Sequence, residues 1–277
     1  MLLLDRALEH MSIAIAVFNQ KGGAGKTPVT INLAGALASL GKRVLVCDLD
    51  GQVALTTSVG FDSDVYEDSG DSIYSLITEL EGEVKKVIRP APNDDFDVLP
   101  GNIQMYLAEK ALSTARNRER RLELIFEGMN ESYDYILVDC PPSLGTVTDN
   151  ALLACRRILI PARMHQTYTY TITTLLAQIG TLENAFRLDI EIVGVVPVAY
   201  VPNADQKEFM AGLQESVPQY LTPVLRRRET VIDDARQSGC SIFSYRPTSS
   251  YRAKAQRESR EDYLCLAKYV MKRVSEG

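Results

Sequence analysis

Apolar and polar positions follow two patterns along the chain, and these patterns predict its secondary structure. Short, nearly continuous apolar runs, such as residues 136–138, are typical of strands that are buried on both faces. Such runs predict strands at residues 13–19, 43–49, 96–99, 135–139, 157–160, 190–197 and 222–225. Longer stretches of mixed polarity between them predict helices at residues 27–40, 102–113, 118–129, 145–154, 168–186, 204–215, 230–238 and 252–273.

This alternation of strands and helices predicts the fold class. We expect an α/β fold, a three-layer sandwich whose mostly parallel central sheet is flanked by helices. In such sheets ligands bind outside the carboxyl ends of the strands, so the loops that follow the strands are candidate sites. The polar, acidic residues 60–72 predict a surface loop with no chemistry of its own.

Composition limits the possible classes of protein. A chain of 277 residues with 45% hydrophobic and 24% charged residues is typical of a globular protein. We expect one domain over residues 1–277, with a short N-terminal extension at 1–11 and a basic C-terminal region at 226–277. Five scattered cysteines without a Cys-x-x-Cys motif favour a cytoplasmic protein. No apolar run reaches the length of about 20 residues that a membrane span needs.

The loop after the first predicted strand carries the most specific motif in the chain. Residues 20–28 have the sequence Gln-Lys-Gly-Gly-Ala-Gly-Lys-Thr-Pro, between a predicted strand and a predicted helix. Glycines let the backbone N–H groups converge on phosphate oxygens, and the helix N-terminus favours negative charge. Lys26 is expected to neutralise the β- and γ-phosphates of a nucleotide, and the Thr27 hydroxyl to bind Mg²⁺. The motif predicts a P-loop NTPase-like fold.

Carboxylates follow two other predicted strands at the same edge of the sheet. Asp48 and Asp50 end one strand, and either could face the metal while the other faces a water molecule. Asp139 follows four apolar residues, the Walker B pattern, and is expected to hold a water molecule of the Mg²⁺ shell. Three such elements in this order make coincidence a poor explanation.

Together these motifs resemble the ParA/MinD/Soj group of deviant-Walker-A ATPases, and most of all the ParA partition proteins. Residues 21–27 match the Lys-Gly-Gly-x-Gly-Lys-Thr motif of that group, and residues 48–52 resemble its Asp-x-Asp-Pro-Gln segment. Residues 138–144 match its Walker B and switch II segment, and residues 97–102 and 241–247 resemble two further segments. The resemblance therefore extends over residues 12–272.

The resemblance implies roles for individual residues. Lys21 corresponds to the signature lysine that reaches the nucleotide of a second copy across a homodimer interface, where it stabilises transition-state charge. Asp50 corresponds to the residue that orients the attacking water, and Asp48 to a carboxylate near the metal. The catalytic residues implied are Lys21, Lys26 and Asp50, and the metal residues are Thr27, Asp50 and Asp139. The nucleotide contacts implied are Lys21, Gly22, Gly23, Ala24, Gly25, Lys26, Thr27, Pro28, Asp48 and Asp139.

Two residues depart from the pattern of the family. Pro28 replaces a usual threonine, and a proline is tolerated there because it falls in the first turn of a helix. Gly51 replaces the usual proline after Asp50, which should loosen this segment. We expect both departures to affect the rate of ATP turnover more than nucleotide binding.

Basic residues in the C-terminal region predict a DNA partner. Residues 226–277 contain 12 basic and 7 acidic residues, whereas the whole chain has a net charge of −6. Arginine and lysine contacts to phosphates give affinity that is independent of sequence and sensitive to salt. The candidate DNA contacts are Arg226, Arg227, Arg228, Arg246 and Arg252. The alternative is that these arginines only solvate a terminal helix. In addition, Val231 occupies a position where the family has an arginine, so the basic surface could be built differently here.

The implied function is an ATP-dependent partitioning or positioning ATPase. Its cofactors are ATP and Mg²⁺, and hydrolysis is slow until a ParB-like activator stimulates it. Because few residues precede the first strand, we expect the short ParA type, which binds DNA non-specifically and lies on the nucleoid. Two alternatives remain: a MinD-like membrane-cycling protein, and an ATP-dependent dimerisation clamp with little hydrolysis. We expect no stable membrane association, because the apolar stripe of residues 260–274 is modest. An iron–sulfur reductase is disfavoured because the switch II match already explains Cys140.

Overall fold

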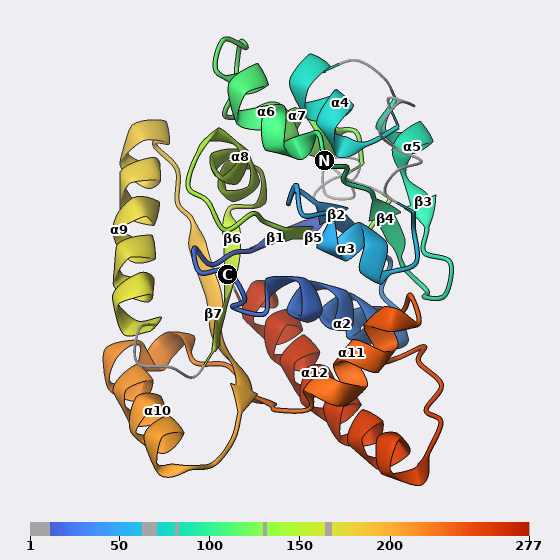
Figure 1. Cartoon of the computed structure of the whole chain (residues 1–277). Helices are drawn as coiled ribbons and strands as arrows, with labels where there is room; N and C mark the ends of the chain where they lie inside the picture. Colours follow the sequence, from blue (N-terminus) through green and yellow to red (C-terminus); the bar gives the residue numbers. More distant parts are fainter. Residues whose placement is uncertain (1–11, 63–70, 81–82, 130–131, 164–167, 277) are drawn as a thin grey trace, which may run out of the picture.

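A computed structural model describes residues 12–62, 71–80, 83–129, 132–163 and 168–276 (Figure 1). The proposed N-terminal extension at 1–11 and most of the predicted loop at 60–72 lie outside the described residues. Among the described residues, no helix is long and apolar enough to cross a membrane.

The described strands form one eight-stranded sheet in the order β3-β4-β2-β5-β1-β6-β7-β8. Every neighbouring pair is parallel except β3 and β4, which confirms the predicted mostly parallel sheet. The strands are β1 Ile13–Val17, β2 Val44–Asp48, β3 Arg89–Pro90, β4 Asp97–Leu99, β5 Tyr135–Asp139, β6 Arg157–Arg163, β7 Glu191–Tyr200 and β8 Leu225–Arg226.

Helices cover both faces of the sheet, as predicted (Figure 1). They are α2 Lys26–Ser39, α3 Ala54–Ser58, α4 Ile73–Glu79, α5 Val84–Val87, α6 Met105–Leu112, α7 Arg121–Glu127, α8 Thr146–Cys155, α9 Tyr168–Phe186, α10 Ala204–Ser216, α11 Glu229–Gln237 and α12 Ser250–Ser275. A 3₁₀ turn spans Pro218–Tyr220. Helices α2, α11 and α12 lie on one face, and α4, α6, α7 and α8 lie on the other (Figure 1).

The central strands supply side chains to two separate cores. Successive residues of a strand point to opposite faces, so β1 contributes Ala14 and Ala16 to one hydrophobic cluster and Ile15 and Val17 to the other. The second cluster contains apolar residues of α2 and α12. Burial on both faces explains why these strands are continuously apolar.

The sequence patterns missed α3, α4, α5 and the short strand β3. These elements have only two to seven residues, too few for a periodic pattern to show. The strand predicted at 222–225 instead forms at Leu225–Arg226, preceded by an isolated bridge between Val195 and Leu221.

Candidate nucleotide site

The carboxyl ends of β1, β2 and β5 bring the three predicted motifs together. In the sheet register Asp48 lies opposite Asp139, and Asp139 lies opposite Val17, the last residue of β1. Both carboxylates are almost fully buried, with exposed fractions of 0% and 1%. Two acids side by side at a buried edge are costly unless a cation joins them.

The phosphate loop has the open backbone that an oxyanion requires. Gly23 and Gly25 have φ angles of 72° and 95°, in the left-handed region that favours glycine. Around Gly22 and Gly23 the space is empty, since a Cβ on either would meet no atom within 4 Å. A Cβ on Gly25 would come within 2.9 Å of Val198, because β7 packs against the loop there. The loop therefore leaves room on its outer side for a ligand.

Asn19 braces this loop, a role that the motif pattern did not reveal. Its Nδ2 donates to the carbonyl of Pro161 at 2.7 Å, and its Oδ1 accepts from the Lys21 amide at 2.9 Å. Its own carbonyl accepts from Lys26 Nζ at 3.2 Å. The Lys26 ammonium is buried and so is held near the centre of the loop. An asparagine two residues after the end of β1 is the sequence signal that could have indicated this brace.

Thr27 and Asp139 form the most informative contact of the site. The Thr27 hydroxyl donates to Asp139 Oδ2 at 2.6 Å, whereas Asp139 Oδ1 is buried without a hydrogen-bond partner. Burial, and then the charge of Asp48, raise the pKa of Asp139 well above its usual value. A hydrated Mg²⁺ would supply the missing partner and the missing positive charge, so this donor set fits the metal.

Asp48 organises the loop that follows β2. Its Oδ2 accepts from the amide and the hydroxyl of Thr56 at 2.9 and 2.8 Å, and its Oδ1 accepts from the Asp50 amide at 3.2 Å. Burial raises the pKa of Asp48 to about 6, although these hydrogen bonds oppose the shift. Thr56, which sequence reasoning did not single out, also accepts from the Gly101 amide at 3.0 Å.

Asp50 begins a tight turn, here called the Asp50 turn, over residues 50–53. Its Oδ1 accepts from the Gln52 amide at 3.0 Å, and its carbonyl accepts from the Val53 amide at 2.8 Å. Val53 has a φ of 55°, a left-handed conformation that costs a β-branched residue about 1–3 kcal/mol. Since Val53 is also buried, the surrounding contacts hold this strained turn in place.

Pro28 is compatible with its position in α2. Lys26 begins the helix, so the N–H that proline lacks would have had no partner within the helix. The Pro28 carbonyl accepts from Asn32 Nδ2 at 2.8 Å and from the hydroxyl of buried Tyr263 at 3.4 Å. This position links the start of α2 to α12.

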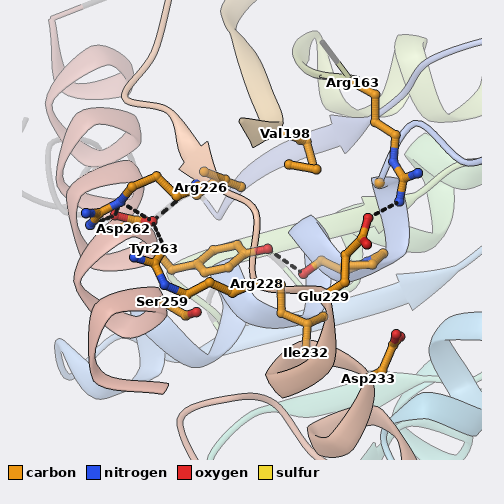
Figure 2. A pocket seen from close by; sticks show the side chains of 14 residues that line it. Arg163, Val198, Arg226, Arg228, Glu229, Ile232, Asp233, Ser259, Asp262 and Tyr263 are labelled. Carbon is orange, nitrogen blue, oxygen red and sulfur yellow. Dashed lines mark hydrogen bonds and ion pairs between the residues drawn. The ribbon is translucent and has the colours of Figure 1, made fainter. Parts of the chain in front are cut away.

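A pocket opens beside the phosphate loop (Figure 2). Gly25 and Pro28 line it together with residues of β6, β7, β8, α11 and α12. Val198 and Ala199 lie on its β7 side, where the register of β7 against β8 shifts and Ala199 has a φ of 56°. Arg163, the β6 residue next to Val198 in the register of the sheet, pairs with Glu229 at 3.4 Å (Figure 2).

Comparisons with known proteins agree with this geometry. A family model described as an AAA domain matches residues 12–192, which contain the phosphate loop, Asp48, Asp50 and Asp139. The chain is 32% identical over 266 residues to the sporulation initiation inhibitor protein Soj of Bacillus subtilis, covering 94% of this chain and 98% of that protein. The chain belongs to the ParA/Soj/MinD family of P-loop ATPases.

Another relative and two solved structures are also similar to this chain. The chromosome partitioning protein ParA of Myxococcus xanthus is 29% identical over 97% of this chain and 91% of its own. Cobyrinic acid a,c-diamide synthase of Mycobacterium smegmatis, solved with bound ADP and magnesium, is 26% identical at a TM-score of 0.73, over 83% of this chain and 93% of that one. An ATP complex of Cyanothece McdA has a TM-score of 0.79 at 21% identity, over 96% and 97% of the two chains, and so shows the shared fold.

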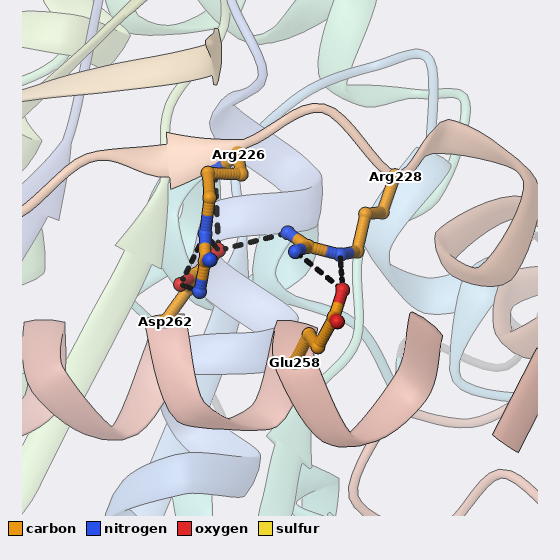
Figure 3. A network of polar contacts seen from close by, with 4 residues as sticks. All are labelled: Arg226, Arg228, Glu258 and Asp262. Atoms are coloured by element: carbon orange, nitrogen blue, oxygen red, sulfur yellow. Dashed lines mark hydrogen bonds and ion pairs between the residues drawn. The ribbon is translucent and has the colours of Figure 1, made fainter. Parts of the chain in front are cut away.

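In this ParA-family chain, two of the predicted DNA-binding arginines are bound to acids of α12 (Figure 3). Arg226 pairs with Asp262, and Arg228 pairs with Asp262 at 3.1 Å and with Glu258 at 2.7 Å. The side chains of Arg228 and Asp262 are only 13% and 10% exposed. We call these four residues the arginine–acid network.

The other predicted DNA residues have different surroundings. Arg227 is exposed and pairs with Glu229 at 3.0 Å, and Arg252 pairs with Asp234. Arg246 is exposed in the segment between α11 and α12. Val231 is buried in the core between α11 and the sheet, so an arginine could not occupy that position without repacking.

Proposed function

We propose that this protein is a partitioning or positioning ATPase that binds ATP with Mg²⁺ at the carboxyl edge of the sheet. The observation that carries the proposal is the buried, unpartnered Asp139 Oδ1, on a carboxylate that accepts from the Thr27 hydroxyl through Oδ2 and feels the charge of Lys26. A buried polar atom without a partner in a native fold calls for an absent ligand. ADP, magnesium and ATP in the named structures of relatives support the same ligand here.

Each residue of the edge has a defined task in this proposal. The amides of residues 22–27 receive the phosphates, and Lys26 neutralises their charge. Thr27 and Asp139 hold the Mg²⁺, which neutralises charge that develops on the phosphate oxygens. Asp50 orients the attacking water, while Asp48 fixes the backbone of the Asp50 turn. The pocket beside Gly25 and Pro28 accommodates the base and ribose of the nucleotide.

The nucleotide site is completed by a second copy of the chain. The proposal for Lys21 is that it crosses the interface of an ATP-bound homodimer and stabilises charge in the partner's site. Its exposed neighbours Gly22 and Gly23 leave this side of the loop accessible to a second copy. The dimer holds DNA non-specifically until a ParB-like activator stimulates hydrolysis, and the protein is thereby located on the nucleoid.

The decisive experiment is phosphate release with Mg²⁺-ATP, measured alone, with DNA and with the activator. We expect release from the wild-type protein well above that of an Asp50→Ala control. Release equal to the control, with ATP binding retained, would leave only an ATP-dependent clamp. Lys21→Ala should keep ATP affinity but lose ATP-dependent dimerisation or turnover, and unchanged kinetics would remove its role across the interface.

A further inference from the structure

Helix α6 contacts the Asp50 turn through Tyr106. A Cβ on Gly51 would lie 2.9 Å from Cγ of Tyr106 and 3.0 Å from its backbone nitrogen. Gly51 is buried beneath this ring, although the tyrosine as a whole is 55% exposed. Gly51 does not have a positive φ, so the need for glycine comes from the close approach of α6.

The same helix contacts the start of α8 through Glu109. Its carboxylate accepts from the amides of Thr146 and Val147, both at 2.9 Å. A Cβ on Gly145 would lie 2.6 Å from one of the Glu109 oxygens. Tyr106 and Glu109 are three residues apart, which places them on one face of the helix. Helix α6 therefore contacts the loops that follow β2 and β5, the strands that carry Asp48 and Asp139.

We propose that Tyr106 is a positioning residue for Asp50, and that Glu109 fixes α6 against α8 so that Tyr106 can act. This inference rests on the proposed function, because Asp50 orients the attacking water there. Within the Asp50 turn, the hydrogen bonds to Gln52 and Val53 are local and leave Val53 in its strained conformation. The Tyr106 ring adds a contact from outside the turn, and this contact prevents the turn from relaxing.

The inference also gives Gly51 a purpose. The family usually has proline here, which restricts the backbone through its own ring. In this chain a proline would collide with Tyr106, as even a Cβ does. Here the Tyr106 ring on α6 restricts the backbone of the Asp50 turn instead. Gly51 is thus tightly held, in contrast to the looseness that the glycine alone suggests.

The experiment compares Tyr106→Ala with Tyr106→Phe, which keeps the ring, and with Leu107→Ala as a matched control. Leu107 is the next residue of α6 and is 56% exposed, close to the value for Tyr106. Hydrogen exchange of the Gln52 and Val53 amides is measured without nucleotide, and phosphate release is measured with Mg²⁺-ATP. For Tyr106→Ala we expect exchange about tenfold faster and kcat about tenfold lower, with KM within about twofold, because the ring packs on Gly51 whereas Asn19 braces the phosphate loop. The other two variants should resemble the wild type.

Each contrary result has a clear meaning. Unchanged exchange in Tyr106→Ala, or equal acceleration in Leu107→Ala, overturns the positioning role. Accelerated exchange with unchanged kcat also overturns it, because the turn would then move without consequence for Asp50. If the wild-type protein releases no more phosphate than Asp50→Ala, the proposed hydrolysis fails, while the exchange measurement still decides whether Tyr106 holds the turn.

Discussion

The nucleotide edge and the arginine–acid network both contain buried charges, but they differ in how these charges are satisfied. At the nucleotide edge, Asp139 keeps one oxygen without a partner and lies beside Asp48, another buried acid. In the network, every charge of Arg226, Arg228, Glu258 and Asp262 has an opposite charge within 4 Å. The first arrangement is unfavourable until a cation binds, whereas the charges of the second are satisfied within the fold. Unsatisfied charge indicates a ligand site, and charge density alone does not.

The largest expected effect is the loss of nucleotide binding in Lys26→Ala. Lys26 is the buried cation of the phosphate loop, and its removal leaves the phosphates without their main neutralising group. We expect ATP affinity to fall about 100-fold, which corresponds to about 2.7 kcal/mol. Calorimetric titration measures this change, and Lys268→Ala, an exposed lysine of α12, serves as the control. Equal affinities in the two variants would contradict the assignment of the loop.

Removal of Asp262, the acid that both arginines of the network contact, should have a somewhat smaller effect, on stability and not on binding. Asp262→Ala leaves the buried Arg228 with only Glu258 of its two acids, which should lower the free energy of unfolding by about 2 kcal/mol. Glu258→Ala should cost much less, because more than a third of the Glu258 side chain is exposed and water screens its charge. Urea unfolding of both variants measures the difference. Equal losses would show that the network has no buried centre.

The opposite sign is expected for an acid of the nucleotide edge. The raised pKa of Asp139 means that its charge is unfavourable in the folded state without metal. Asp139→Asn should therefore increase the stability of the nucleotide-free protein by about 1 kcal/mol, and it should lower ATP affinity in Mg²⁺ about tenfold. Thermal unfolding in EDTA and titration with and without Mg²⁺ test both parts. If Asp139→Asn were less stable than the wild type, Asp139 would stabilise the fold as Asp262 does, and the two regions would not differ.

DNA retention separates arginines that are exposed from arginines that are bound to acids. Arg246→Ala should reduce the slope of log affinity against log salt by about 0.9 if Arg246 contacts one phosphate. Arg228→Ala should leave this slope unchanged, because the Arg228 side chain is 13% exposed and neutralised by two acids. Salt titration of DNA binding gives both slopes. If only Arg228→Ala reduced the slope, the DNA-binding surface would lie at the arginine–acid network.

The smallest effect concerns Asp149 on α8, a half-buried acid outside both regions. Burial, and then the nearby Glu109 and Glu119, raise the pKa of Asp149 to about 6. A raised folded pKa gives stability that is present below about pH 4 and is lost as the pH rises through about 6. Asp149→Asn should therefore stabilise the protein by up to about 1 kcal/mol at pH 7 and by almost nothing at pH 4. Urea unfolding at both pH values checks the sign.

The sequence allowed the nucleotide edge to be predicted in more detail than the C-terminal region. Phosphate binding depends on local backbone geometry, so a short motif such as residues 21–27 contains most of the information. Strands β1, β2 and β5 can be recognised in the sequence because they are continuous apolar runs. By contrast, Arg226 and Arg228 meet acids 30 to 36 positions away, and no local pattern shows that pairing. The contact of Tyr106 with Gly51 is hidden for the same reason, because it joins segments that only the tertiary fold brings together.

The two ends of the sheet have a consequence for how copies of this protein can assemble. Both edge strands, β3 and β8, have only two residues, and β3 contains Pro90, which has no N–H to offer. Beyond the long strand β7, backbone bonds from Thr222 and Arg227 cover part of the exposed ladder. The sheet therefore presents little template for strand addition. Among the described residues, association of copies through helices and loops is therefore favoured over association through strand edges.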